Sequence, residues 1–280
     1  MTSWPRSAHL LRNNAHFRSL MCHCAWVRYA RHRAITDELR DGAVSVQDLV
    51  ARLGVSAATI RRDLAELSDA GLVRRVHGGA APLTVADVPA EVDRPYEEVA
   101  DDAAADKQAI ARRAAELVRD GDTILLDIGT TTGALAHELK GRSITVITPS
   151  LAVLDALRGD PAVDIVLLGG ALRRSYHSLV GPLTEEALRR VRASTVFLGT
   201  SGVDAQGWVL DTTSVEVPTK RLLLEAGGQV VMLADRTKFP GQGSIRVCDF
   251  GAVSTLITNA DAQHPTLVLA RAHGTDVLLA

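Results

Sequence analysis

The alternation of short apolar runs with helical segments after residue 107 is the feature that most constrains the fold. The runs are TILLD, ITVIT, VDIVLLG, STVFLG, QVVMLAD and STLIT. Each is too short for a helix and almost continuously apolar, which is typical of a strand buried on both faces. Helices between such strands produce a mostly parallel sheet covered on both sides. We therefore predict an α/β domain, with an aliphatic core because only 4% of the residues are aromatic.

A different pattern, before residue 80, predicts a group of three short helices. Gly42 ends the first, which is expected over residues 31 to 39. Ser45 then precedes VQDLVARL, with Asp48 three residues on. In this arrangement the serine caps a helix and the acid reaches back to the cap. Gly54 permits the tight turn that ends this second helix.

The third helix begins after Ser56, which is its expected cap. Ile60, Leu64 and Leu67 recur at helical spacing, so they form one buried stripe. Thr59 faces outward in this arrangement. The short turn between the second and third helices predicts a helix-turn-helix, whose second helix presents its first turns to the major groove of DNA.

Arg61 and Arg62 lie on or beside the exposed face of the third helix. In a helix-turn-helix they would bind guanine edges or phosphates. The alternative is that they are solvated arginines partly paired with Asp63 or Glu66. The following stretch, LVRRVHGGA, predicts a β-hairpin wing able to touch backbone phosphates, which favours the DNA-binding interpretation. The candidate DNA-contacting residues are Ser45, Ser56, Thr59, Arg61, Arg62, Arg75, His77 and Gly78.

Charge is divided unevenly along the chain. The formal net charge is −2, but the segment up to Gly79 is net basic and the remainder is net acidic. A basic N-terminal segment followed by an acidic remainder indicates that the N-terminal segment binds a polyanion and that the remainder does not. Double-stranded DNA is therefore the expected partner of the N-terminal segment.

Three cysteines cannot make a disulfide framework, and no apolar run approaches the roughly 18 residues of a membrane helix. We therefore expect a cytoplasmic protein. Residues 1 to 26 precede the first helix and read as an unstructured extension, and either Met21 or Val27 is a plausible true start. The Cys22-His23-Cys24 run matches no structural zinc pattern, so no metal site and no cofactor are expected.

Ligands of parallel α/β sheets bind at the carboxyl ends of the strands. The first strand is followed by DIGTTTG, whose glycines admit close backbone approach and whose hydroxyl and N–H groups can bind oxygens at a helix start. This predicts an anion-binding loop over residues 129 to 132, although a threonine-rich helix cap without a ligand is an equal alternative. The loop is no P-loop, because Gly-Lys-Ser/Thr is absent.

Further candidates follow the other strands: glycines and arginines at 169 to 174, GTSG at 199 to 202, and Asp235 with Lys238. Taken singly, these are ordinary turn glycines and solvated charges. They become candidates because all should lie at one edge of the sheet.

The runs TIRRDL and RVHGGA, and later DIGTTTGALA, LLGGALRRSYHSLVGP, FLGTSGVD and LADRTKF, resemble the DeoR-type bacterial transcription regulators over residues 27 to 260. The resemblance implies a winged helix-turn-helix and an effector domain with a fold similar to ribose-phosphate isomerases. It implies a phosphorylated sugar or related metabolite as effector, and it implies that Lys220 and Lys238 are cations near it. Pro149 stands where many relatives have Asn, so one hydrogen bond to the effector is missing. The candidate effector-binding residues are Asp127, Gly129, Thr130, Thr131, Thr132, Gly170, Arg173, Ser201, Gly202, Lys220, Asp235 and Lys238.

These observations predict an extension at 1–26, a winged helix-turn-helix at 27–82, a linker at 83–106, an effector domain at 107–262 and a C-terminal segment at 263–280. The expected function is a repressor of a carbohydrate-utilisation operon, acting as a homo-oligomer on operator DNA and controlled by a sugar phosphate. The alternative is a sugar-phosphate isomerase-like enzyme with an appended basic domain. Asp204 is the only acid near the turn where those isomerases carry their acid-rich loop, which favours a receptor without turnover.

Overall fold

The computed structural model describes residues 31–32, 34–39, 42–69, 73–82 and 94–280. The chain divides into two compact units, which meet in the sequence between Pro82 and Leu83. The expected extension, the Cys22-His23-Cys24 run and linker residues 83–93 lie outside the described residues. Within the described part, no helix is long and apolar enough to cross a membrane.

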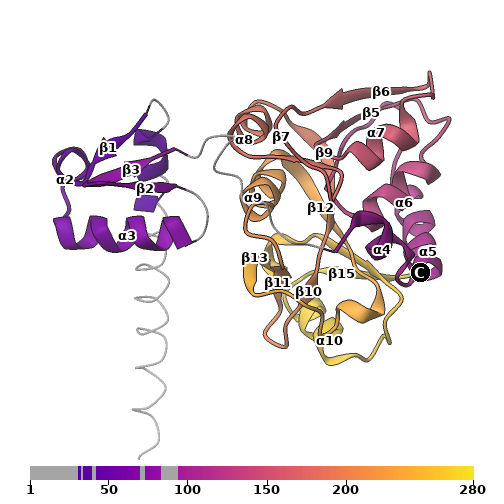
Figure 1. The fold of residues 1–280 in the computed structure, drawn as a ribbon. Helices are drawn as coiled ribbons and strands as arrows, with labels where there is room; N and C mark the ends of the chain where they lie inside the picture. The colour runs from indigo at the N-terminus through magenta and orange to yellow at the C-terminus, as the bar shows by residue number, and fades with distance from the viewer. Residues whose placement is uncertain (1–30, 33, 40–41, 70–72, 83–93) are drawn as a thin grey trace, which may run out of the picture. The chain divides into compact units, whose positions relative to one another are not determined.

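The N-terminal unit contains two full helices and a small antiparallel sheet. Residues 31–32 and 34–38 are helical, and α2 (Val46–Leu53) and α3 (Ala57–Asp69) follow (Figure 1). The strands are β1 (Val44–Ser45), β2 (Arg74–Val76) and β3 (Gly79–Ala81), in the order β1-β3-β2. The fold is therefore a winged helix-turn-helix, in which β2 and β3 form the predicted hairpin.

Local signals in the sequence explain where these helices begin and end. The Ser45 hydroxyl accepts from the Asp48 backbone N–H at 3.1 Å and donates to its carboxylate at 2.7 Å, so the predicted cap is confirmed. Gly54 ends α2 in the left-handed conformation with φ of 67°. Gly79 is required for another reason: a Cβ there would lie 2.2 Å from the Val44 carbonyl oxygen of the paired strand.

The predicted apolar stripe is confirmed. Ile60, Leu64 and Leu67 are buried in one cluster with Ile35 and Leu49. Every buried member of this cluster lies between residues 35 and 80. The N-terminal unit therefore has a core of its own.

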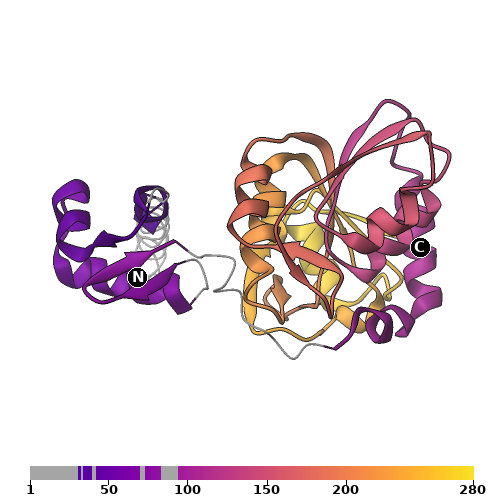
Figure 2. The same cartoon turned by 45° about the horizontal axis from the view of Figure 1, so that its top comes forward.

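A seven-stranded, entirely parallel sheet forms the C-terminal unit, in the order β15-β14-β12-β9-β4-β5-β6 (Figures 1 and 2). A three-stranded sheet of order β10-β11-β13 and the β7-β8 hairpin accompany it. The predicted α/β class is confirmed. The strands of the parallel sheet are β4 (Thr123–Leu126), β5 (Ile144–Thr148), β6 (Val163–Leu167), β9 (Ala193–Gly199), β12 (Gly227–Leu233), β14 (Thr255–Thr258) and β15 (Asp276–Leu279).

Helices cover both faces of this sheet. Neighbouring strand residues alternate between two cores: Leu126 packs with α5, α6 and α7, whereas Leu125 packs with α8 and α9. The remaining elements are α4 (Tyr96–Asp101), α5 (Ala104–Ala115), α6 (Thr130–Glu138), α7 (Leu151–Leu157), β7 (Ala171–Arg173), β8 (Ser178–Val180), α8 (Pro182–Arg189), β10 (Gly202–Val203), β11 (Trp208–Asp211), α9 (Val217–Ala226), η2 (Arg236–Lys238), β13 (Ile245–Asp249), η3 (Phe250–Ala252) and α10 (Pro265–Ala272).

The unit extends beyond the expected range of 107–262 at both ends. On its N-terminal side, α4 and the start of α5 fall within the expected linker. At the other end, residues 263–280 provide α10 and β15, and β15 pairs with β14 in the parallel sheet. The stretch before residue 107 shows only weak apolar periodicity, and the elements against which both stretches pack lie elsewhere in the sequence.

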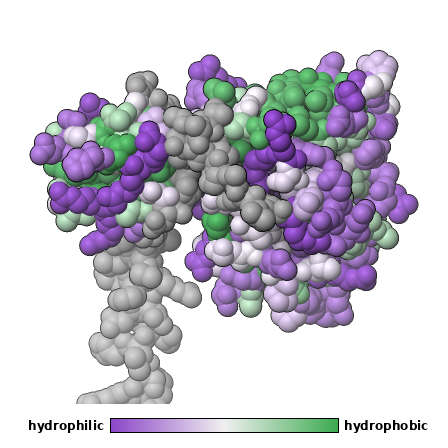
Figure 3. All heavy atoms as spheres, viewed as in Figure 1, coloured by the Kyte–Doolittle hydropathy of each residue, from purple (hydrophilic) through white to green (hydrophobic). Residues whose placement is uncertain are grey.

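One edge of the C-terminal unit exposes apolar side chains. Val166 and Leu167 are in β6, Leu172 is in β7, and Leu183, with 62% of its surface exposed, is in the first turn of α8. Figure 3 shows a green area along the upper edge of this unit, where Figure 1 places these elements. We call these four residues the β6–α8 apolar patch.

Candidate functional site

The candidate DNA-contacting residues lie on the exposed side of the N-terminal unit. Arg61, Arg62, Arg75, His77 and Gly78 are exposed. Gly78 lies in the β2–β3 turn with φ of 78°, a conformation that suits glycine. The predicted positions at the helix start and in the wing are therefore open to a partner.

The three hydroxyl-bearing candidates have capping contacts. The Ser56 hydroxyl accepts from the Thr59 backbone N–H at 3.2 Å and lies 2.9 Å from the Thr59 hydroxyl oxygen. Ser45 caps α2 in the same way. These contacts account for the three residues structurally, so contact with DNA stays a prediction for them.

Asp63 does not neutralise the two arginines beside it. Its side chain is 2% exposed and accepts from Arg31 at 2.5 and 2.9 Å. His32 Nε2 lies 3.1 Å from the same carboxylate. Within the described ranges, neither Arg61 nor Arg62 forms an ion pair, so the alternative in which they pair with Asp63 or Glu66 is not observed.

His32, Asp63 and Glu66 also form a group with metal-ligand spacing. The Arg31 guanidinium already occupies both oxygens of Asp63, and a cation there would repel a metal ion. We therefore interpret the group as an internal ion-pair network of the N-terminal unit.

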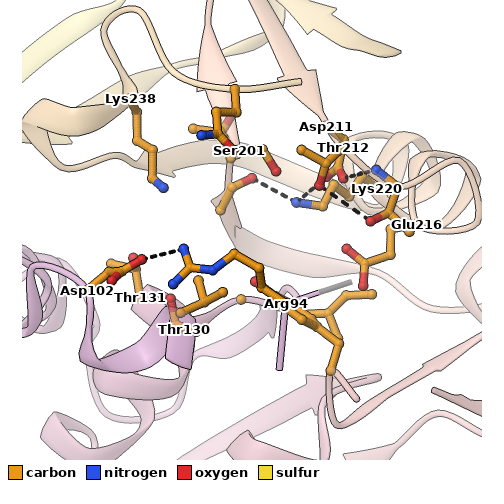
Figure 4. A pocket seen from close by; sticks show the side chains of 18 of the residues that line it. Arg94, Asp102, Thr130, Thr131, Ser201, Asp211, Thr212, Glu216, Lys220 and Lys238 are labelled. Carbon is orange, nitrogen blue, oxygen red and sulfur yellow. Dashed lines mark hydrogen bonds and ion pairs between the residues drawn. The ribbon is translucent and has the colours of Figure 1, made fainter. Parts of the chain in front are cut away.

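The C-terminal unit contains a cavity of about 420 Å³ at the carboxyl ends of β4, β9 and β11 (Figure 4). Predicted effector-binding residues that line it are Gly129, Thr130, Thr131, Ser201, Lys220 and Lys238. They come from the loop after β4, the loop after β9, α9 and η2. The topology therefore brings together side chains that are far apart in the sequence.

Loop 129–132 presents its backbone to the cavity. The first hydrogen bond within α6 runs from the Gly133 N–H to the Gly129 carbonyl at 2.9 Å. The backbone N–H groups of Thr130, Thr131 and Thr132 therefore have no acceptor within the helix. Thr130 and Thr131 line the cavity, whereas the Thr132 hydroxyl points inward and donates to the Asp127 and Gly129 carbonyls, each at 2.8 Å.

Lys220 and two carboxylates form a buried charge cluster in the cavity wall, where Lys220 and Asp211 line the cavity and Asp127 does not. The Lys220 ammonium lies 3.1 Å from Asp127 Oδ2 and 3.0 Å from Asp211 Oδ2, and it donates to the Gly199 carbonyl at 3.1 Å. Burial acts to lower the pKa of Lys220, but the surrounding carboxylates raise it well above its ordinary value. Lys220 is therefore held as a cation by the protein itself.

Asp127 differs from its predicted role. It is fully buried, its Oδ2 accepts from the Gly199 N–H at 3.0 Å, and its Oδ1 has no hydrogen-bond partner within the described part of the chain. It does not line the cavity. Its position beneath the loop makes it the counter-charge of Lys220 rather than a direct ligand of a hydroxyl group.

A second buried pair joins Arg173 to Glu216. Glu216 lines the cavity, and burial together with the nearby Asp211 carboxylate raises the pKa of Glu216 to about 8. Arg173 itself lies behind the wall, where its guanidinium is 5.7 Å from the centre of the Tyr176 ring. The positive charges of Arg173 and Lys220 act in the opposite direction and favour the carboxylate form of Glu216.

Three predicted positions, Gly170, Gly202 and Asp235, have packing or capping roles instead, and Pro149, where a contact was expected to be missing, lies outside the cavity lining. A Cβ on Gly170 would meet Thr184 Oγ1 at 2.0 Å, and one on Gly202 would meet Gly241 backbone atoms at 2.6 Å. Asp235 caps η2 by accepting from the Thr237 N–H at 2.9 Å. The Pro149 carbonyl accepts from the Leu179 N–H at 2.8 Å, and Pro149 does not line the cavity.

Sequence reasoning missed several lining residues. The Glu216-to-Lys220 spacing of four was a usable signal, because it places both side chains on one helical face. Asp211 ends an apolar run, as Asp127 does. Arg94 gave no signal, because it lies in a stretch expected to be linker. The lining residues that were missed are Arg94, Val99, Asp102, Ile128, Tyr176, Asp211, Thr212, Thr213, Glu216, Thr237 and Gln242.

Two family models match the chain, one for each unit. Residues 31–84 match the DeoR-like helix-turn-helix domain, and residues 102–260 match the DeoR C terminal sensor domain. The chain belongs to the DeoR family. Its N-terminal unit is thus the DNA-binding domain and its C-terminal unit the sensor domain.

Curated DeoR-family relatives match most of the chain. The glycerol-3-phosphate regulon repressor of Escherichia coli (strain K12) is 34% identical over 232 residues, which are 82% of this chain and 90% of that protein. The HTH-type transcriptional regulator GlpR of Haloferax volcanii is 35% identical over 231 residues, covering 82% and 89%. The putative aga operon transcriptional repressor of Escherichia coli O157:H7 is 30% identical over 251 residues, covering 89% and 93%.

Among solved structures, ribose 5-phosphate isomerase A of Methanocaldococcus jannaschii is 18% identical, with a TM-score of 0.36, over 48% of this chain and 53% of that one. This likeness is too weak to carry an argument about function. The family assignment and the helix-turn-helix together make the chain a DNA-binding transcriptional regulator, and they exclude the isomerase-like enzyme considered from the sequence.

Proposed function

We propose that this DeoR-family regulator represses a carbohydrate-utilisation operon and releases its operator when a phosphorylated sugar or related metabolite binds the sensor cavity. The observation that carries the proposal is the convergence of loop 129–132 and Lys238 on one cavity. The DNA target supports a cytoplasmic location. The names of the relatives, which include a glycerol-3-phosphate regulon repressor, support an effector of this class.

Phosphate suits this cavity for electrostatic reasons. The N–H groups that begin α6 and the positive end of its helix dipole favour an anion. Lys238 adds a cation from the opposite wall, as Figure 4 shows. Lys220 contributes less, because two carboxylates already neutralise it.

Polar side chains line the rest of the cavity and suit the hydroxyl groups of a small polyol or sugar. Ser201, Thr212 and Gln242 offer both donors and acceptors, and the Glu216 carboxyl group offers oxygen acceptors. The volume of about 420 Å³ accommodates a small phosphorylated metabolite. Specificity among such metabolites would arise from these hydroxyl contacts.

Matched pairs of esters and free polyols test this proposal. We expect glycerol 3-phosphate, ribose 5-phosphate or fructose 6-phosphate to bind at least about a hundredfold more tightly than its unphosphorylated counterpart, because two or more charge-assisted hydrogen bonds are lost without phosphate. Isothermal titration calorimetry measures each pair. Equal affinity of an ester and its free counterpart across all pairs would refute the phosphate assignment.

The same samples provide a control for turnover. After long incubation, the ester should be recovered unchanged, because the protein is a regulator. In the presence of operator DNA, the ester that binds should also lower the affinity for DNA, since only a ligand with different affinities for the two states shifts the equilibrium between them.

We further propose that the protein acts as a homo-oligomer through the β6–α8 apolar patch. One helix-turn-helix covers one half-site, so an operator read by two heads requires a second copy. Strand β6 is the edge of the parallel sheet, and the patch beside it contains the most exposed large apolar side chain of the described residues, Leu183.

A charge placed in the patch should therefore dissociate the oligomer. We expect Leu183→Asp to lower the molar mass measured by size-exclusion chromatography with light scattering, because a carboxylate would be buried unpaired in the interface. Val268→Asp is the matched control, since Val268 is 49% exposed on α10, outside the patch. An unchanged mass for Leu183→Asp, or an equal loss in both variants, would place the interface elsewhere.

A further inference from the structure

Arg94 lines the sensor cavity, and in the sequence it lies between the segment that joins the two units and α4 (Tyr96–Asp101). Figure 4 shows its guanidinium extending into the cavity on the side of Thr130 and Thr131. We propose that Arg94 binds the phosphate of the effector and thereby transmits occupancy of the cavity to the joining segment. This inference rests on the proposed function.

The chain next to Arg94 is fixed firmly to the sensor domain. The Tyr96 N–H donates to the Ser175 carbonyl at 2.8 Å, and its ring stacks on His177 at 5.4 Å between centroids. Its hydroxyl lies against Gly133 of α6, where a Cβ would come within 2.1 Å. Tyr96 is therefore held in place on the sensor domain. A movement of the Arg94 side chain would reach the joining segment through the backbone of residues 94 and 95.

The charges around Arg94 favour an anion. Its Nη1 donates to Asp102 Oδ2 at 2.6 Å. The positive charges of Lys107 and Lys238 also act on Asp102. Burial, and after it the charge of Lys238, lowers the pKa of Lys107 to about 8. A phosphate dianion would bring negative charge to the side of the cavity where Arg94 and Lys238 carry positive charge.

Asp102 is a weak competitor for the guanidinium. Arg94 and Asp102 are 58% and 57% exposed, and ion pairs this open to water contribute little. A phosphate binds an arginine through two parallel N–H donors, which is stronger and more directional. Binding would thus exchange Asp102 for phosphate, and the Arg94 side chain would move relative to the fixed Tyr96.

The test compares Arg94→Gln with Arg113→Gln, an arginine of α5 that pairs with Glu116 and does not line the cavity. The probe is glycerol 3-phosphate, or whichever ester ranks first in the matched-pair screen of the wild type. We expect Arg94→Gln to raise the Kd for the ester at least about tenfold, and to leave DNA binding without ester unchanged. At saturating ester, Arg94→Gln should retain operator DNA that the wild type releases. Arg113→Gln should behave as the wild type does.

A second variant moves the affinity in the opposite direction. Asp102→Asn removes the competitor and one negative charge, so the ester should bind several-fold more tightly than to the wild type. If the wild type binds the ester and Arg94→Gln binds it equally well, or still releases DNA fully at saturation, this inference is wrong while the proposed function stands. If the wild type binds no ester, both are wrong.

Discussion

Replacing Lys220 by methionine is expected to lower the free energy of unfolding of the sensor domain by about 3 to 5 kcal/mol. The ammonium lies between the carboxylates of Asp127 and Asp211, which are 0% and 2% exposed. Methionine fills a similar volume but leaves both carboxylates in a dry environment without a counter-charge. Removing one partner of a buried charge cluster therefore costs far more than the intact cluster contributes.

Urea denaturation followed by circular dichroism measures this effect, and the thermal midpoint should fall by about 10 °C. Lys140→Met is the matched control, because Lys140 is exposed after α6 and its loss should change stability by less than about 0.5 kcal/mol. The DNA-binding domain has its own core, so its affinity for DNA below the transition should persist. Equal stability of the two variants would show that Lys220 does not balance the two carboxylates.

The second large effect is expected on DNA. The double variant Arg61→Ala/Arg62→Ala should weaken operator binding by about 2 to 5 kcal/mol, which is about thirtyfold to several thousandfold, because an arginine at a base edge contributes about 1 to 3 kcal/mol and one at a phosphate adds to it. Both side chains are exposed and lack ion pairs with any residue in the described ranges, so their removal should not disturb the fold.

The single variants separate the two roles. Loss of a base contact should relax sequence preference at one operator position, whereas loss of a phosphate contact should weaken all DNA and flatten the salt slope by about one unit. Fluorescence anisotropy over a range of salt concentrations measures both. The control is Arg112→Ala/Arg113→Ala, an adjacent arginine pair in α5 of the sensor domain. Operator affinity equal to wild type in the Arg61/Arg62 variant would rule out their role in DNA binding.

Much of the fold could be predicted because its signals are local. A serine three residues before an acid predicts the start of α2, Gly54 predicts its end, and the spacing of Ile60, Leu64 and Leu67 predicts which side of α3 is buried. Strand runs such as ITVIT are likewise recognisable without their neighbours. Strand β15 was not recognised, although its sequence DVLL is apolar, because its four residues do not by themselves show that they pair with β14 at the edge of the sheet.

The cavity was only partly predictable for a related reason. Loop 129–132 follows a strand in the sequence, so the rule for parallel sheets points to it. Gly170 and Gly202 satisfied the same rule but are glycines because neighbouring atoms leave no room for a Cβ. Whether a charged residue faces a cavity or a buried counter-charge depends on contacts between distant segments, as with Asp127 and Lys220.

The separate core of the DNA-binding domain has a consequence for how the protein is made. The buried apolar residues described in it have all been translated once residue 81 is added, so the domain can fold while the ribosome is still adding the sensor domain. At ordinary elongation rates that takes on the order of ten to forty seconds. During this interval a nascent chain already carries a folded DNA-binding domain with Arg61 and Arg62 exposed. It does not yet have a complete sensor cavity in which a metabolite could bind. Newly made molecules would therefore meet DNA first and the metabolite second.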